Sequence, residues 1–242
     1  MQQTESATNR GAVAALVIAT APGASPLARD LLWRSVLGRP LISYPLHELQ
    51  FVDELGFCGL VAPRGHRSKG LELLHSIAPS DYNQFMTPPD NTWFKALAAL
   101  CDTPIFSKWI IVIDATFPLM TAATVRAGLR AANQTGIAIA GEPVKETLKR
   151  VHRRDVIETP LRGNLRRLLS PAIFQREALE RVLDRYTASS SLPDDLVALT
   201  RLAGVPLTVF DAGYPAVRIT SEDDLAIVET LLRQRESEAH PS

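Results

Sequence analysis

Cysteine is scarce in this chain, and its thiols lie in apolar surroundings. Only Cys58 and Cys101 occur among 242 residues. This predicts buried free thiols in a reducing cytoplasm, not a disulfide framework or a cysteine metal site. The five histidines lack the spacing of metal ligands, and no G-x-S-x-G motif occurs. Zinc chemistry and triad hydrolysis are therefore disfavoured.

Net charge is also lacking, because 26 basic residues balance 26 acidic residues. We expect neither nucleic acid nor a membrane as a partner, since no overall positive field recruits them. The first apolar run, VAALVIATA, is too short to span a bilayer. It also lacks the preceding positive segment of a signal peptide. We interpret it as a buried first strand.

Apolar residues make up 46% of the chain and charged residues 21%, enough for a sizeable core. Continuous apolar runs alternate with segments of helical periodicity. This alternation predicts an α/β fold with a mostly parallel sheet covered by helices on both faces. Ligands of such folds bind beyond the carboxyl ends of the strands.

The expected elements follow from periodicity and from turn residues. Strands are predicted over AVAALVIATA, GFCGLVAP, WIIVID, GIAIAGEPV, VPLTVFDAG and AVRIT. Helices are predicted over PLISYPLHELQFVDEL, LELLHSIA, NTWFKALAALCD, TAATVRAGLRAAN, FQREALERVLDRY, PDDLVALTRLAG and SEDDLAIVETLLRQ. Residues typical of helix boundaries support these: Pro40 in a first turn, Thr121 and Asp194 as N-caps, Gly204 at an end, and Ser221 with Asp224 as a capping-box variant.

The alternation stops between Pro143 and Pro171. This segment is rich in basic residues and poor in apolar ones, so it cannot belong to a compact core. We predict a projecting arm with short strands over residues 143–171. The whole chain, residues 1–242, is predicted to form one domain with flexible ends over 1–11 and 234–242.

Two polar features follow predicted strands at the edge where ligands are expected. The stretch AALVIATAPGASPLARD runs from a strand into a loop of small residues, the outline of a phosphate-binding loop. Asp114 ends the strand WIIVID. Their convergence at the carboxyl edge is the main indication of a site.

Several stretches match one family in order and spacing. VIDATFPLMTAATV resembles the DAARPL-(V/T)-T stretch of 2-C-methyl-D-erythritol 4-phosphate cytidylyltransferases, and PVKETLKRV resembles their PV-x-DTIK-x-V stretch. LRGNLRRLLSPAIF is similar to DRxxLWxxQTPQxF, and LGRPLISYPL to LxGxPLLxHTL. The resemblance continues from PDDLVALTRLAG through ITSEDDLAIVETLL and so covers nearly the whole chain.

This resemblance implies a Rossmann-like nucleotidyltransferase fold and a homodimer whose arms reach each other's active sites. The implied reaction joins CTP to a sugar-alcohol phosphate, releases pyrophosphate with Mg²⁺, and belongs to isoprenoid biosynthesis. It also implies roles for four residues. Asp114 matches the metal-associated aspartate, Thr147 the threonine of DTIK, and Arg162 the arm arginine. Arg218 occupies the lysine position of the KIT stretch.

The nucleotide side departs from the family pattern. The residues in its place are Ala19, Ala21, Gly23, Ser25 and, for the base-binding stretch, Thr92. The family's loop arginine aligns near Ser25 and its lysine near Leu31. A charge-assisted contact contributes about 1.5–3 kcal/mol. Losing two such contacts to the triphosphate therefore lowers the expected rate by several powers of ten.

Two functions stay open on the sequence. The first is a divergent cytidylyltransferase, or a relative that uses another nucleotide or alditol phosphate. The second is a catalytically inactive paralogue that binds a phosphorylated metabolite or a partner protein through the same fold. Family membership favours the first, and the loss of the loop cations favours the second.

Overall fold

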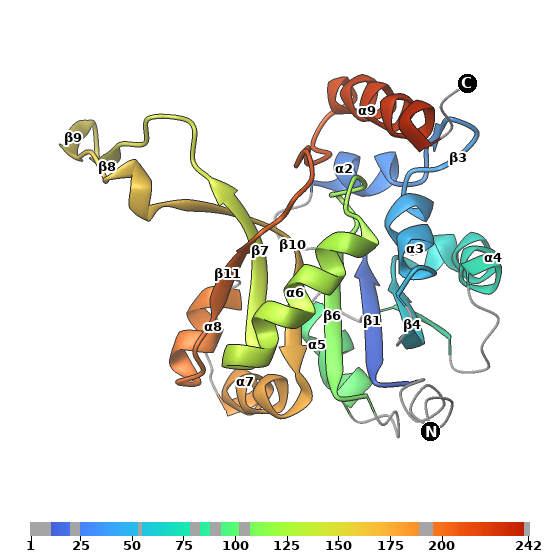
Figure 1. The fold of residues 1–242 in the computed structure, drawn as a ribbon, viewed down its shortest axis with the longest axis horizontal. Helices are drawn as coiled ribbons and strands as arrows, with labels where there is room; N and C mark the ends of the chain where they lie inside the picture. The colour runs from blue at the N-terminus through green and yellow to red at the C-terminus, as the bar shows by residue number, and fades with distance from the viewer. Residues whose placement is uncertain are drawn as a thin grey trace.

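A seven-stranded sheet forms the centre of the protein (Figure 1). The computed structural model describes residues 11–19, 25–52, 55–77, 83–87, 93–101, 107–188 and 196–239. The strand order is β11-β7-β10-β6-β1-β4-β5, and only β10 runs antiparallel to its neighbours. The strands are β1 Val13–Ile18, β4 Leu55–Val61, β5 Gln84–Met86, β6 Trp109–Asp114, β7 Ile137–Pro143, β10 Arg166–Gln175 and β11 Thr208–Asp211.

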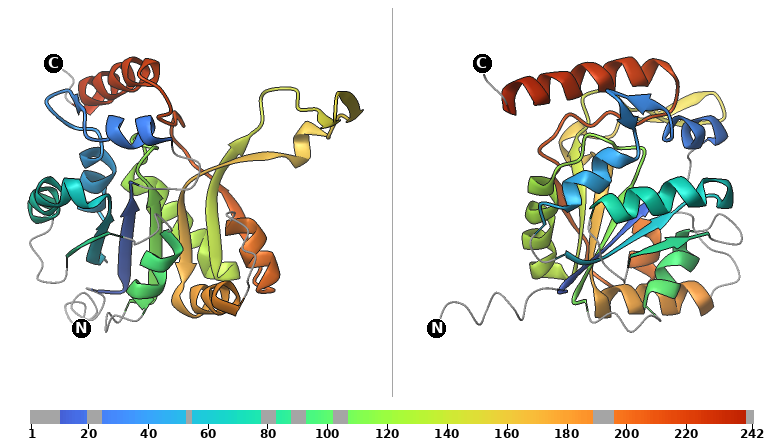
Figure 2. Two further views of the ribbon diagram at one scale, coloured as in Figure 1. Left: turned by 180° about the vertical axis from the view of Figure 1, so that it is seen from behind. Right: turned by 90° about the vertical axis from the view of Figure 1, so that its right-hand side faces the viewer.

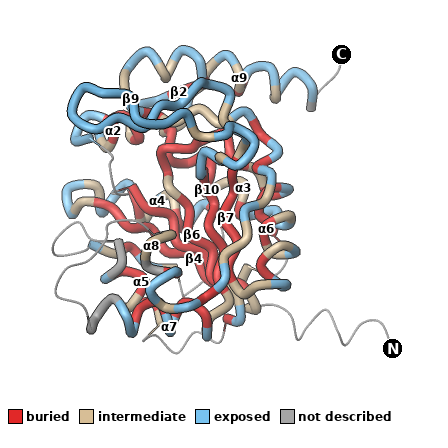
Figure 3. Tube along the Cα trace, turned by 90° about the vertical axis from the view of Figure 1, so that its left-hand side faces the viewer, coloured by how far each residue is buried: buried red, intermediate tan, exposed pale blue. Residues whose placement is uncertain are grey.

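Helices cover both faces of this sheet, as the strand composition predicted. Alternate residues of β1 belong to two separate cores, because successive side chains of a strand point to opposite faces. Ala15 and Val17 lie in a core with α3 (Ser43–Leu49), α4 (Arg67–Ile77) and α6 (Ala122–Thr135). Ala14 and Leu16 lie in a core with α5 (Trp93–Cys101) and α7 (Arg176–Ala188). Burial runs along the central strands between these layers (Figure 3). The fold is therefore the predicted Rossmann-like α/β arrangement.

The helices largely match their predicted positions. They are α2 Pro26–Leu31, α3 Ser43–Leu49, α4 Arg67–Ile77, α5 Trp93–Cys101, α6 Ala122–Thr135, α7 Arg176–Ala188, α8 Leu196–Leu202 and α9 Asp223–Ala239. Thr121 caps α6, since its hydroxyl accepts the Thr124 N–H at 3.2 Å. Gly204 follows α8 in the left-handed conformation, with φ of 63°. The predicted cap Asp194 lies outside the described residues.

Three local predictions need correction. Pro40 lies in β3 (Arg39–Pro40), which pairs with β2 (Ser35–Val36), and the helix begins only at Ser43. The stretch AVRIT is not a strand: the Ile219 N–H donates to the Thr116 carbonyl at 2.8 Å, outside any ladder. The expected flexible tail from residue 234 is helical as far as Ala239.

The arm projects from the sheet as a short hairpin (Figures 1 and 2). It contains β8 (Arg150–His152), β9 (Asp155–Glu158) and the 3-10 turn η2 (Arg162–Asn164). All residues of both hairpin strands are exposed. The arm ends earlier than predicted, because β10 begins at Arg166 and places Pro171 inside the sheet.

Both cysteines are free thiols. Cys58 is buried in β4, and burial raises the pKa of its thiol to about 12. Cys101 at the end of α5 is partly exposed. Among the described helices, none is both long and apolar enough to cross a membrane.

Candidate active site

Asp114 is held at the carboxyl end of β6 by the neighbouring antiparallel strand. Its backbone N–H donates to the Ser170 hydroxyl of β10 at 3.0 Å. The Tyr214 hydroxyl, which follows β11, donates to the Ser170 carbonyl at 2.7 Å. Ser170 therefore joins the ends of three chain segments, and it fixes the backbone from which the Asp114 carboxylate extends.

The Asp114 carboxylate has two different partners. Its Oδ1 accepts the Thr116 N–H at 2.9 Å and the Thr116 hydroxyl at 2.7 Å. Its Oδ2 faces the Arg218 guanidinium, with Nη2 at 3.4 Å. Arg218 Nε also donates to Thr116 Oγ1 at 3.2 Å. The structure thus brings together Asp114 and Arg218, two residues predicted for the site.

Burial raises the pKa of the Asp114 carboxyl above its ordinary value, while the Thr116 hydrogen bonds and the Arg218 charge act in the opposite direction. The side chain remains about one-fifth exposed, at 21%. A partly buried carboxylate with an adjacent cation is typical of a functional site. The exposed fraction leaves room for a ligand to contact it.

Arg218 of this pair lines a groove of about 530 Å³. The Arg167 guanidinium crosses one side: its Nε donates to Glu142 Oε1 at 2.7 Å, and its Nη2 donates to the Ala216 carbonyl at 2.8 Å. The groove is lined by Phe117, Arg167, Leu168, Leu169, Ala216, Val217, Arg218, Thr220 and Asp224. Its wall is partly apolar and carries two guanidinium groups, each paired with a carboxylate, together with the Asp224 carboxylate.

The other predicted substrate residues lie on the arm. Thr147 and Arg162 are exposed. Arg162 Nη1 donates to the Lys145 carbonyl at 3.3 Å, which ties η2 to the opposite side of the arm. Within a single chain the arm extends away from the sheet (Figure 2). The described residues do not bring Thr147 or Arg162 to Asp114.

The nucleotide side is described only at its borders. Ala19 follows β1, and its N–H donates to the Val61 carbonyl at 2.8 Å. Ser25 caps α2 by accepting the Ala28 N–H at 3.0 Å. Leu31, at the family's lysine position, is buried in the core and so cannot be replaced by lysine without burying a charge. The predicted residues Ala21, Gly23 and Thr92 lie outside the described residues.

Sequence patterns missed several residues of this site. Thr116 and Ser170 lie within the quoted family-like stretches, but their hydrogen bonds depend on strands distant in sequence.

The Trp33 indole stacks on the His66 ring at 4.3 Å between centroids and 3° between planes. Trp33 Nε1 is buried without an acceptor in the described part of the chain. No pattern in the sequence predicts that Trp33 and His66 are in contact.

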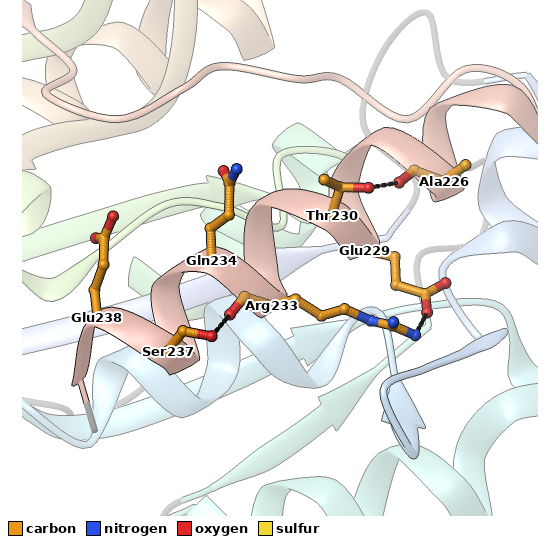
Figure 4. Close-up of a pocket in the computed structure, with 7 residues that line it drawn as sticks. All are labelled: Ala226, Glu229, Thr230, Arg233, Gln234, Ser237 and Glu238. Carbon is orange, nitrogen blue, oxygen red and sulfur yellow. Dashed lines mark hydrogen bonds and ion pairs between the residues drawn. The ribbon is translucent and has the colours of Figure 1, made fainter. Parts of the chain in front are cut away.

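A second hollow, of about 770 Å³, lies along the outer face of α9 (Figure 4). Its described lining comes from that one helix: Ala226, Glu229, Thr230, Arg233, Gln234, Ser237 and Glu238. Arg233 is paired with Glu229, and Thr230 and Ser237 donate to carbonyls of the preceding turn. Since the described lining comes from one exposed helix face, its polar groups do not converge on a ligand, and we assign no site here.

The sequence profile of 2-C-methyl-D-erythritol 4-phosphate cytidylyltransferases matches residues 13–234. The chain belongs to this family. The family's enzyme from Dehalococcoides mccartyi is 24% identical over 226 residues, which cover 92% of this chain and 96% of that protein.

The fold is also that of solved members of this family. The 4-diphosphocytidyl-2C-methyl-D-erythritol synthase of Anaerococcus prevotii superposes with a TM-score of 0.78 at 19% identity, covering 91% of this chain and 98% of that one. A CMP:2-keto-3-deoxy-manno-octonic acid synthetase complexed with CTP superposes with a TM-score of 0.66 at 14% identity, covering 92% and 99%. The nucleotidyltransferase-like fold is therefore shared beyond the family itself.

Phe117 lies beside the Asp114–Arg218 pair. The Arg218 guanidinium carbon lies 5.7 Å from the Phe117 ring centroid, within range of a cation–π contact. The guanidinium thus places a positive charge next to Asp114 in a planar fork.

Asp114 also fits a role in Mg²⁺ binding. Magnesium sites in nucleotide enzymes commonly use one or two carboxylates, with substrate phosphates and water completing the octahedron. The described residues contain no group of three or more acidic, histidine or cysteine side chains that could hold a metal ion. A single carboxylate at the carboxyl edge fits an ion carried mainly by the nucleotide.

Proposed function

We propose that the chain transfers a cytidylyl group from CTP to 2-C-methyl-D-erythritol 4-phosphate, the reaction of its family in isoprenoid biosynthesis. The main support is the Asp114–Arg218 pair, at 3.4 Å, beside a groove at the carboxyl edge of the sheet. This arrangement provides one carboxylate for Mg²⁺ and one guanidinium for phosphate oxygens at the same point.

The reaction requires little covalent chemistry from the protein. A phosphate oxygen of the sugar-alcohol phosphate attacks the α-phosphorus of CTP, a new P–O bond forms, and the bond to pyrophosphate breaks. Catalysis of this kind depends on positioning and on stabilising negative charge. Mg²⁺ bound with CTP would neutralise part of that charge. Thr116 fixes the carboxylate that would hold the ion, and Arg218 orients a phosphate oxygen beside it.

The arm supports a homodimer in this proposal. Thr147 and Arg162 are exposed on the arm, which projects from the sheet (Figure 2), so we infer that they serve the groove of a partner subunit. In a dimer of the family type each arm crosses to the partner's groove. Arg162 would then bind the phosphate of the sugar alcohol through a two-pronged hydrogen bond.

A second function remains a candidate because of the nucleotide loop. Ser25 is used as a helix cap and Leu31 as a core residue, so neither supplies the loop cation that the family motif has there. A chain with an intact sugar-phosphate side and a weak triphosphate side would bind the phosphorylated alcohol without turnover.

Pyrophosphate release distinguishes the two functions. The assay contains CTP, Mg²⁺ and 2-C-methyl-D-erythritol 4-phosphate, with the Asp114→Asn protein as the background control. Alcohol-dependent release on the order of 1 per second is typical of an enzyme and would establish cytidylyl transfer. Release no faster than the control, with calorimetric binding of the phosphorylated alcohol retained, would establish the binding protein instead.

A further inference from the structure

The segment after β4, which comprises η1 (Arg64–His66) and the start of α4, is basic and follows the strand next to β1. Residues 62–70 include Arg64, Arg67 and Lys69 and contain no acidic residue. β1 and β4 are adjacent parallel strands, so their carboxyl ends share one edge of the sheet. The hydrogen bond from the Ala19 N–H to the Val61 carbonyl, 2.8 Å long, joins the residue directly after β1 to the end of β4.

A ring stack also joins this basic segment to the residues that follow α2. Trp33 follows α2, the helix that begins just after the β1 loop, and His66 lies in the 3-10 turn η1 (Arg64–His66). Their rings stack at 4.3 Å and are nearly parallel. The basic segment is thus held at two described points, near Ala19 directly after β1 and at Trp33 beyond α2.

The cations of this segment, from η1 and the first turn of α4, are exposed to solvent. Arg64, Arg67 and Lys69 are exposed, and none of them forms an ion pair within the described residues. Arg67 lies over the Phe85 ring of β5, with its guanidinium carbon 5.8 Å from the centroid. Open space adjoins Gly65 between the arginines, where a side chain would meet no atom within 4 Å.

We propose that Arg64 and Arg67, with Lys69, bind the triphosphate of the nucleotide. They would replace the two loop cations of the family motif, whose positions carry Ser25 and the buried Leu31. Guanidinium groups bind phosphate oxygens with two parallel hydrogen bonds, and an ammonium adds a point charge. The proposal rests on the proposed function for the identity of the nucleotide, CTP, but its anion-binding part can be measured without turnover.

The test is calorimetry with sodium tripolyphosphate and with CTP in Mg²⁺. The Arg64→Ala/Arg67→Ala protein is compared with wild type and with Arg130→Ala/Arg181→Ala. This matched control removes two exposed arginines from α6 and α7, away from the basic segment after β4. We expect Arg64→Ala/Arg67→Ala to lower the affinity for both ligands at least about tenfold, since each charge-assisted contact is strong. Arg130→Ala/Arg181→Ala should change these affinities less than about twofold.

Unchanged tripolyphosphate binding in the Arg64→Ala/Arg67→Ala protein, equal weakening by both pairs, or no binding of tripolyphosphate by wild type would overturn the proposal. Arg64→Gln/Arg67→Gln serves as a second pair if the alanine protein fails to fold. The outcomes separate the two proposals. Arginine-dependent tripolyphosphate binding without pyrophosphate release keeps this inference and rejects the enzyme. Turnover with an unchanged KM for CTP in the Arg64/Arg67 variants keeps the enzyme and rejects this inference.

Discussion

The Arg218 guanidinium lies 3.4 Å from the Asp114 carboxylate, although the two residues are 104 positions apart in the chain. Thr116 contacts both of them, as donor to Asp114 Oδ1 and as acceptor from Arg218 Nε. The three side chains form one hydrogen-bonded unit at the carboxyl end of β6. A substitution at one of the three should therefore change the hydrogen bonding of the other two.

Asp114→Asn should remove activity while leaving the fold intact. The asparagine Oδ1 can still accept both Thr116 hydrogen bonds, so we expect a small change in Tm. The lost charge should lower kcat by about a hundredfold or more, because phosphoryl transfer depends on charge stabilisation. Pyrophosphate release measures the rate, and circular dichroism measures Tm. Full activity in the Asp114→Asn protein would show that the Asp114 carboxylate has no role in the reaction.

Arg162→Ala should weaken the binding of the phosphorylated alcohol by about 1.5–3 kcal/mol, roughly ten- to a hundredfold in affinity. Arg162→Lys should recover only part of this affinity, because an ammonium lacks the planar fork. Calorimetry with 2-C-methyl-D-erythritol 4-phosphate provides the measurement. Arg154→Ala, another exposed arginine of the arm, is the control. Identical losses for Arg154 and Arg162 would show that only the general charge of the arm matters.

The apolar side chains of the arm should hold a homodimer. Ile157 and Leu161 are 60% and 77% exposed in the single chain, so Ile157→Ser/Leu161→Ser should cost the monomer little. Each side chain buried between arms would stabilise the dimer by about 1.5–3 kcal/mol. Light scattering at micromolar concentration should show a wild-type dimer and a largely monomeric variant. Leu202→Ser, also 60% exposed but on α8, should remain dimeric. A monomeric wild type would contradict the dimer.

Glu48 connects three helices and should contribute measurably to stability. Its Oε2 accepts the Ala122 N–H at the start of α6 at 2.8 Å, and its Oε1 lies 3.5 Å from Arg235 Nη1 of α9. Glu48→Ala should lower the free energy of unfolding by about 1–2 kcal/mol. Glu229→Ala breaks only an exposed pair with Arg233 within α9 and should cost less than about 0.5 kcal/mol. Equal losses in urea unfolding would show that the bridge from Glu48 adds nothing.

The start of α9 should lose stability in acid. Burial of the Asp224 carboxyl raises its pKa. The hydrogen bonds that the carboxylate accepts from Thr220 and Ser221 lower the pKa by a larger amount, so the net shift is downward. A carboxyl whose pKa is lower in the folded state stabilises the fold above its unfolded pKa, about 3.9, and loses that effect as pH falls through the folded pKa.

Asp224→Asn should therefore destabilise the protein at pH 7, by about 1 kcal/mol for a capping interaction. Urea unfolding at pH 7, 5 and 3.5 should show the difference from wild type shrinking only at the lowest pH. A difference that is the same at all three values would mean that the carboxylate charge is irrelevant at this helix start.

Local sequence was enough for most elements of the fold. Continuous apolar runs such as VAALVI and WIIVID predicted strands because strands buried on both faces need such runs. Thr121 predicted the start of α6 because its cap involves only the next turn of the same helix. Asp114 could be placed at the carboxyl edge because it directly follows one of these runs.

Tertiary contacts decided the features that local patterns misassigned. Pro40 lies in a hairpin because Leu37 and Gly38 adopt positive φ angles of 49° and 84°, which turn the chain before the helix starts. The stretch AVRIT looks like a strand, yet its Ile219 N–H bonds to the Thr116 carbonyl in a loop.

The sequence by itself determined the α/β class, the family and the position of Asp114 at a strand end, since each depends on neighbours in the chain or on motif order. Only the tertiary structure decided that Arg218 meets Asp114, that Leu31 is core and that Trp33 stacks on His66. Those relationships join segments distant in sequence. Side-chain burial and hydrogen bonding between such segments depend on how the sheet and its helices pack, which periodicity within one segment cannot encode.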